Sequence, residues 1–337
     1  FSMFVPTEYV ALSINLVSVI SSAATVLLLH LIIVRLVREW QGPESGWTTL
    51  DRFSALAGGV IGAAAFAVTD SFWFNAVEAE VYAMSMLFTA AAIWLVLRWR
   101  ELAAIEEAKM KGGSHLFGLD ANRYLILIAY LFGLAIGIHL LNLLALFFIA
   151  LIVFFVEFDK EEWTAKQRVI GIVVTGAVAS TAFLIIYPGI VQVLPDLIGN
   201  SGAPILASLI FLSVIIFAIH YTQTKRLQAA NLVVLCITMV LIGYSTYALI
   251  FIRSASDPPI DENDPETVEA IVSYLKREQY GQTPILKGNT FDNRRGQIDS
   301  DRTVWFPRRH SADPIHNQLY GNYRSDSEFF WKYQVGH

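Results

Sequence analysis

Three carboxylates stand between two long apolar runs in the stretch DSFWFNAVEAEVYAM, residues 70–84. Asp70 is expected to end one membrane crossing, and Glu78 and Glu80 to open the next. An ionisable group at the mouth of a helix bundle is costly unless it faces a polar cavity or a partner, and a carboxylate in such a cavity can accept the proton of a reacting hydroxyl. A plainer explanation is also open, because the helix dipole favours an acid in a first turn and Trp73 is typical of a membrane-interface aromatic belt.

A second polar pair, His139 and Asn142, lies inside another apolar stretch. Their i, i+3 spacing puts both side chains on one face of a helix. A single histidine in an apolar hairpin often only holds a packing hydrogen bond, and that explanation stays open. Both polar segments are nevertheless predicted, from the charges discussed below, to lie on one membrane face, which favours a shared cavity. We expect Glu80 and His139 to point into it.

The apolar runs around these residues are typical of membrane helices. Of the 337 residues, 55% are hydrophobic, and the mean hydropathy is +0.51. Soluble domains have roughly 45–50% apolar residues, and an apolar run of about 18 residues can span a bilayer. The sequence therefore predicts an all-α polytopic membrane protein with a transmembrane bundle over residues 1–252. We expect about eight crossings, at residues 10–34, 53–72, 80–97, 124–139, 140–157, 169–187, 204–221 and 229–252.

Two breaks in this pattern follow from local sequence. The fourth and fifth crossings form one apolar stretch, residues 124–158, which would reach about 50 Å as a single helix. Because that is too long for one crossing, the stretch is predicted to turn near Gly137. Tyr187-Pro188-Gly189 is expected to end the sixth helix, since proline lacks the N–H that a helix interior needs.

Basic residues predict the orientation of the bundle. Alternate connections between the crossings hold thirteen Lys and Arg residues, whereas the opposite connections hold none. Because loops rich in Lys and Arg face the cytoplasm, the acids, His139 and the tail from Arg253 onward are predicted to share the extracytoplasmic face. The connections without basic residues are 1–9, 73–79, 137–140 and 188–203.

The composition changes after residue 252, and residues 253–337 are predicted to form a mixed extracytoplasmic loop domain. One amphipathic helix is expected near residues 264–280, with Asp264 as its N-cap and Pro265 in its first position.

The sequence lacks the motifs that are typical of several classes of protein. The sequence has no Walker loop and no GxGxxG motif, which argues against ATP-driven transport. Cys236 is the only cysteine, so a cysteine-based metal site within the chain is excluded. His310 and His316 lack the i, i+4 spacing of a helical zinc motif, and no metal site is expected. No nucleic-acid partner is expected either.

Several segments taken together resemble a known family. They are FWFNAVEAEVYAMSMLFTAAAIWLVLRW at 72–99, GLAIGIHLLNLLAL at 133–146 and PPIDENDPETVEAIVSYLKREQYG at 258–281, with WFPRRHSADPIHNQLY and FFWKYQVGH near the end of the chain. In these segments the chain resembles the bacterial protein O-mannosyltransferase-like membrane family, which is related to the eukaryotic transmembrane protein O-mannosyltransferases. The resemblance covers most of the chain.

The resemblance implies a GT-C type glycosyltransferase fold. It also implies transfer of a sugar, mannose in the relatives, from a polyprenyl-phosphate donor to protein Ser/Thr hydroxyls on the extracytoplasmic face. Glu80, with Glu78, matches an acidic site of the superfamily, His139 matches the family's hairpin histidine, and Asp70 is a further catalytic candidate. The candidate substrate-binding residues are Asn142, Trp73, Arg253, Arg308 and Arg309, of which the arginines would stabilise the departing lipid phosphate.

The implied location is a bacterial inner membrane, which the chain crosses several times with residues 253–337 on the periplasmic side. The expected partners are the lipid bilayer, the lipid-linked sugar donor and an acceptor protein, with a larger membrane complex as a further option. The family carries an acidic motif in an earlier outer loop and further helices after the segment that matches YQVGH. We therefore expect the chain to be truncated at both ends.

Three functions stay open at this point. The first is the glycosyltransferase. The second is a non-catalytic membrane scaffold or accessory subunit that retains the fold but lacks the first-loop catalytic acid. The third is a transporter with a carboxylate-lined path, which is the weakest because the sequence shows no paired inverted repeats with broken helices at midplane depth.

Overall fold

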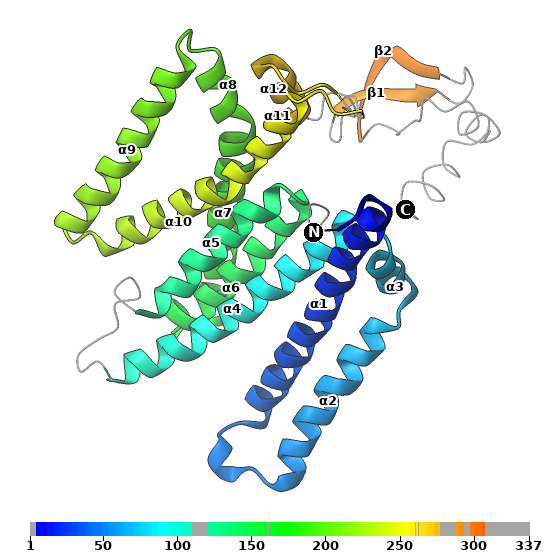
Figure 1. Cartoon of the computed structure of the whole chain (residues 1–337). Coiled ribbons are helices and arrows are strands. Elements are labelled where there is room, and N and C mark those ends of the chain that lie inside the picture. Colours follow the sequence, from blue (N-terminus) through cyan, green and yellow to red (C-terminus); the bar gives the residue numbers. More distant parts are fainter. Residues whose placement is uncertain are drawn as a thin grey trace. The chain divides into compact units, whose positions relative to one another are not determined.

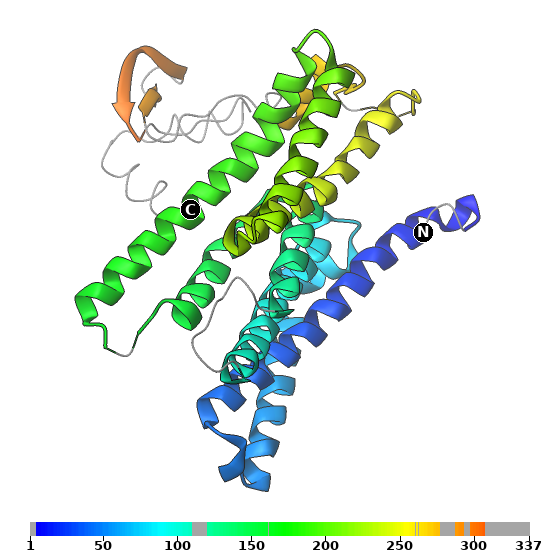
Figure 2. The ribbon, with the colours of Figure 1, turned by 90° about the vertical axis from the view of Figure 1, so that its left-hand side faces the viewer.

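The structure of the chain is a computed structural model, shown in Figure 1 and, turned by 90°, in Figure 2. The chain divides into two units, Phe1–Val272 and Ser273–His337. Long apolar helices dominate the first unit, which confirms the prediction of an all-α polytopic membrane protein. The structure describes residues 5–109, 120–160, 162–259, 261, 263–276, 287–292 and 297–306.

The first long helices pack through small side chains. Helix α1 (Val10–Gln41) contacts both α2 (Thr49–Ala67) and α4 (Val81–Lys109), and both views show α1 beside α2 (Figures 1 and 2). The buried residues of α1 are mostly serine and threonine, and those of α2 include Ala55 and Gly59. Small residues let helices approach closely, which drives helix association in lipid, where apolar burial supplies little.

The connection between α1 and α2 is built from caps. Gly42 follows α1 with φ +82° and ψ −160°, a conformation that is essentially restricted to glycine. A short 3₁₀ turn, η3 (Glu44–Gly46), comes next. The Thr48 hydroxyl then accepts the N–H of Asp51, whose carboxylate accepts the N–H of Thr48 in return. This capping box fixes the start of α2.

The long apolar stretch after residue 122 is divided where the sequence predicts. Helix α5 (Arg123–Ile136) ends at Gly137, and a 3₁₀ segment, η6 (Leu140–Leu144), leads into α6 (Ala145–Glu157). The predicted turn near Gly137 is therefore confirmed. Both α5 and α6 contact α4.

Helix α5 also packs against α10 (Gln228–Tyr244), and two glycines set the distance between them. A methyl group added to Gly133 would collide with the backbone carbonyl oxygen of Val240, and one added to Gly243 would lie 2.5 Å from that of Tyr130. Since backbone cannot move aside as a flexible side chain can, this crossing requires glycine on both helices.

One expected helix end is wrong. Helix α7 (Ala165–Leu184) does not stop at Tyr187-Pro188-Gly189 but continues through a π-helix, η7 (Ile185–Val193), into α8 (Leu194–Gly199). A proline removes one i→i−4 hydrogen bond and clashes with the carbonyl four residues back. The wider π-helical turn changes these pairings, so the chain passes Pro188 without leaving the helix.

Seven helical segments of the described residues are long and apolar enough to cross a membrane. The fourth expected crossing is confirmed as a helix, α5, which has 14 residues. At 1.5 Å per residue it is about 21 Å long, shorter than the roughly 30 Å of a bilayer core, so its crossing of the membrane stays a prediction. The seven segments are Thr7–Gln41, Thr49–Ala67, Val81–Glu106, Leu140–Glu157, Ala165–Gly199, Pro204–Thr224 and Gln228–Ser254. The remaining helical elements of this unit are η2 (Thr7–Tyr9), α3 (Asp70–Val77), η5 (Asp120–Asn122), α9 (Pro204–Thr224), η8 (Ser245–Tyr247) and α11 (Ala248–Ser254).

The expected amphipathic helix of the tail begins later than predicted. Helix α12 runs from Val268 to Lys276, and the Thr267 hydroxyl, not the Asp264 carboxylate, accepts the N–H of Ala270 at 3.2 Å. Asp264 has φ +42°, whereas an N-cap residue needs an extended backbone. The expected end of the helix, residues 277–280, lies outside the described residues.

The second unit contains one hairpin among its described residues. Strands β1 (Lys287–Asp292) and β2 (Gln297–Trp305) pair antiparallel, with an irregularity between Asn289 and Thr290. The Lys287 ammonium lies 5.6 Å from the centre of the Trp305 ring at the open end of the hairpin.

Candidate functional site

The three carboxylates lie at helix ends, but not all at the expected ones. Asp70 does not end the second crossing, because α2 stops at Ala67 and Thr69, in extended conformation, precedes a separate short helix. Asp70 is the first residue of this helix, α3, and Glu78 follows its last residue. Glu80 stands directly before α4, and its N–H donates to the Glu78 carbonyl at 2.9 Å.

Local helix electrostatics account for two of the three acids. Asp70 in the first turn of α3 and Glu80 beside the first turn of α4 face the positive ends of their helix dipoles, whereas Glu78 lies at the negative end of α3. All three residues are exposed, and in the described part of the chain none of them forms an ion pair. Trp73 on α3 is 59% exposed, as an interfacial aromatic residue would be.

The second polar segment forms the break between α5 and α6. His139 precedes η6 with an extended backbone, and its Nδ1 accepts the N–H of Leu141 at 3.2 Å. An accepting Nδ1 leaves the proton of a neutral ring on Nε2, which is then a donor. The ring is half-buried, with its centre 5.3 Å from that of Tyr82 on α4. His139 therefore acts as a local cap, as the plainer explanation requires.

Asn142 is the most deeply buried of the candidates that the structure describes, with 2% of its surface exposed. Its Oδ1 accepts hydrogen bonds from Ser85 Oγ and Thr89 Oγ1 of α4, both at 2.9 Å. Its Nδ2 has no hydrogen-bond partner among the described residues. A buried amide donor without a partner is rare in folded proteins and calls for an explanation.

These contacts bring the two predicted polar segments to the same place. Tyr82, which touches His139, is two residues after Glu80, and Asn142 is bound to the next turns of α4. The corner between α3 and α4 and the break between α5 and α6 therefore meet at the start of α4. That Glu80 and His139 point into one water-filled cavity stays a prediction.

Sequence inspection missed the residues of α4 that make these contacts. Tyr82, Ser85 and Thr89 recur at i, i+3 and i+7, so they form a polar stripe on one helix face. This spacing could have indicated that α4 binds a polar partner on that face.

Comparison with known families gives a match in the N-terminal part of the chain. Residues 1–163 match the family model of the protein O-mannosyl-transferase TMEM260 N-terminal domain. The searches of curated proteins and of solved structures found no match. We call residues 1–163 the TMEM260-like segment. It contains the candidates Asp70, Trp73, Glu78, Glu80, His139 and Asn142.

The cationic candidates lie outside the TMEM260-like segment. Arg253 is exposed in the last turn of α11, just before Ser254, whose hydroxyl donates to the Asp261 carboxylate at 2.7 Å. Arg308 and Arg309 lie outside the described residues.

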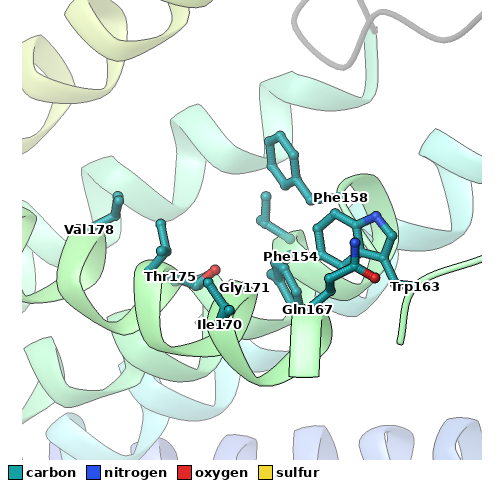
Figure 3. A pocket seen from close by; sticks show the side chains of 11 residues that line it. Phe154, Phe158, Trp163, Gln167, Ile170, Gly171, Thr175 and Val178 are labelled. Carbon is teal, nitrogen blue, oxygen red and sulfur yellow. The ribbon is translucent and has the colours of Figure 1, made fainter. Parts of the chain in front are cut away.

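An apolar groove of about 680 Å³ crosses the end of the TMEM260-like segment (Figure 3). Phe154 of α6 and Phe158, which follows the last residue of that helix, line it together with Ile170 and Val178 of α7, and Trp163 lies at one end. None of the candidates among the described residues lines this groove. Within the described ranges, no three His, Cys, Asp or Glu side chains are grouped so as to hold a metal ion.

Proposed function

We propose that the chain belongs to a GT-C type membrane glycosyltransferase that transfers a sugar, mannose by analogy with the matched family, from a polyprenyl-phosphate donor to Ser/Thr hydroxyls of an acceptor protein. The match of residues 1–163 to a protein O-mannosyltransferase domain and the multi-pass architecture support this. The proposal includes a bacterial inner membrane, with the reaction and residues 253–337 on the periplasmic side.

In the proposed reaction, the acceptor hydroxyl oxygen attacks the anomeric carbon, and the bond from that carbon to the phosphate oxygen breaks. Glu80 takes the hydroxyl proton, which is the role of a general base. The polyprenyl phosphate leaves as an anion that needs a cation or dipoles to stabilise it. Arg253, or Arg308 with Arg309, would supply that charge.

The neighbouring candidates have supporting roles in this proposal. Asp70 and Glu78 are further carboxylates of the same corner, and Trp73 offers an aromatic face to the sugar. His139 offers its Nε2, and Asn142 its Nδ2, as donors to sugar or phosphate oxygens. The observation that supports the proposal is the contact of the break between α5 and α6 with the start of α4, since it brings His139 and Asn142 to the helix that Glu80 directly precedes.

The test is a transfer assay with the full-length protein in lipid nanodiscs, labelled polyprenyl-phosphate mannose and acceptor peptides rich in Ser and Thr. We expect labelled peptide, and we expect Glu80→Gln to lower the rate by about 10²–10⁴-fold, the usual contribution of a general base. The control is Glu8→Gln, which removes an exposed carboxylate from η2, on the same predicted face. No transfer from this donor or from other polyprenyl-phosphate sugars would refute the enzyme proposal.

A second candidate is a non-catalytic scaffold or accessory subunit. It is favoured by the positions of Asp70 and Glu80, because an acid beside a helix N-terminus is explained by the dipole alone. A scaffold would give no transfer in the same assay, while a folded wild-type protein would co-purify with a second membrane protein in fixed proportion.

A further inference from the structure

A cavity of about 720 Å³ lies at the opposite ends of the helices from the candidate site, on the face rich in Lys and Arg. Its lining comes from α1, from the connection between α1 and α2, from α4 and from the start of α5. The charged residues of the lining are Arg35, Arg38, Glu39, Arg98, Arg100 and Glu101. Four arginines and two glutamates leave two positive charges in excess.

The two glutamates do not neutralise the arginines one to one. A single oxygen, Glu101 Oε2, accepts from both Arg35 at 2.7 Å and Arg98 at 2.5 Å. Glu39 pairs with Arg100. Two guanidinium groups therefore share one carboxylate oxygen, although each carries five N–H donors.

Arg38 and Arg35 also have guanidinium groups that could bind an anion. Arg38 forms no ion pair in the described part of the chain, and its guanidinium lies 5.7 Å from the centre of the Trp47 ring. The Nε of Arg35 is buried and has no hydrogen-bond partner among the described residues. An anion in the cavity would satisfy both, because arginine binds phosphate oxygens through several N–H groups at once.

The walls of the cavity are fixed by backbone and aromatic contacts. The Trp47 indole N–H donates to the Gly42 carbonyl at 3.0 Å and holds the connection between α1 and α2 against the cavity. Trp94 and Tyr124 complete the aromatic part of the lining. Tryptophan and tyrosine concentrate where lipid headgroups meet hydrocarbon, so the cavity combines an interfacial belt with a cationic pocket.

We propose that this cavity binds the phosphate of an anionic phospholipid headgroup from the adjacent leaflet. Basic pockets between transmembrane helices on the cytoplasmic side are suited to such headgroups, and that leaflet carries the anionic lipids. The lipid would stay in place during turnover, because the site lies away from the acids at the start of α4. This binding site does not depend on the proposed transferase activity.

The experiment measures binding of short-chain phosphatidylglycerol to the purified full-length protein in neutral detergent, by native mass spectrometry and by titration. Phosphatidylcholine of the same chain length serves as the zwitterionic comparison, and inorganic phosphate as the competitor without a lipid tail. We expect phosphatidylglycerol to bind in a one-to-one complex, phosphatidylcholine to bind much more weakly, and inorganic phosphate to compete only at far higher concentration.

Two neighbouring substitutions on α1 are expected to act in opposite directions. Arg38→Gln removes the arginine of the cavity that forms no ion pair with a described carboxylate, and it should weaken binding about fivefold, as expected for one basic residue near a lipid surface. Glu39→Gln frees Arg100 and should strengthen binding by a similar factor. The control is Arg52→Gln, which removes one exposed charge from the same face outside the cavity and should leave binding unchanged.

Opposite effects at adjacent exposed positions cannot come from a general loss of folding. The assignment would be overturned if Arg38→Gln left affinity unchanged, or if Arg52→Gln reduced it equally, since the binding would then reflect surface charge alone. Inorganic phosphate that competed as well as the lipid would overturn the assignment to a headgroup.

Discussion

Replacing Asn142 by leucine separates a structural role of this residue from a functional one. Asn142→Leu removes two hydrogen bonds to α4, which are worth about 0.6 kcal/mol each in a membrane protein, about 1.2 kcal/mol together. It also removes the buried Nδ2, whose missing partner costs roughly 1–3 kcal/mol. The Ser85 and Thr89 hydroxyls can turn to carbonyls one helical turn earlier. We therefore expect the unfolding free energy to stay constant or to rise by up to about 2 kcal/mol.

Sugar transfer should respond in the opposite sense. If the open Nδ2 binds a charged substrate oxygen, losing that hydrogen bond costs roughly 1.5–3 kcal/mol, which lowers the transfer rate by about 10- to 100-fold. The unfolding free energy comes from an SDS titration in mixed micelles, and the rate from the nanodisc assay with polyprenyl-phosphate mannose. A variant that is at least as stable as the wild type and yet transfers slowly would identify Asn142 as a substrate-binding residue.

The matched control is Asn231→Leu. The Nδ2 of Asn231 donates to Thr222 Oγ1 at 3.0 Å between α9 and α10. Unlike Asn142→Leu, this substitution therefore removes an amide nitrogen that has a hydrogen-bond partner. It should cost about 0.6 kcal/mol of stability and leave the rate unchanged. A loss of more than about 2 kcal/mol in Asn142→Leu would refute the reasoning, because the amide would then be a satisfied structural group, as would an unchanged rate.

Three further predictions concern other positions. Glu80→Gln should keep the wild-type SDS midpoint while the transfer rate falls, and a fall in both would mean that the carboxylate serves the fold. Gly133→Ala should destabilise the protein by about 1–3 kcal/mol in the same titration, because the added methyl meets backbone, whereas Gly176→Ala, which has open space, should not. Gly42→Ala should cost about 1–3 kcal/mol through its backbone conformation alone, and an equal cost in Gly46→Ala would contradict this cause.

Hydropathy and length predicted the long helices because these properties are summed over many residues. A single misjudged residue changes such a sum little, which is why most of each expected crossing is helical in the structure, although the second one ends at Ala67. The turn near Gly137 was predictable for the same reason, since the apolar stretch was too long for one span whatever its local details.

The incorrect expectations each concern one residue at a helix end, where competing local interactions differ by little. Pro188 was expected to stop a helix, but a π-helical turn rearranges the hydrogen bonds around it. Asp264 was expected to cap α12, but Thr267 lies three residues further on and takes that place. Thr69 starts a separate helix at Asp70, although nothing in the apolar pattern required a break there.

The contacts that assemble the candidate site join residues far apart in sequence, and a single sequence does not record such pairs. The stripe of Tyr82, Ser85 and Thr89 indicates that one face of α4 needs polar contacts, because a hydroxyl facing lipid costs free energy. It does not say which segment supplies them. In the structure Asn142 accepts hydrogen bonds from Ser85 and Thr89, while the His139 ring packs against that of Tyr82, and these contacts hold their segment beside the helix start that Glu80 precedes. If the site is catalytic, breaking this polar contact should therefore lower sugar transfer even where Glu80 itself is intact.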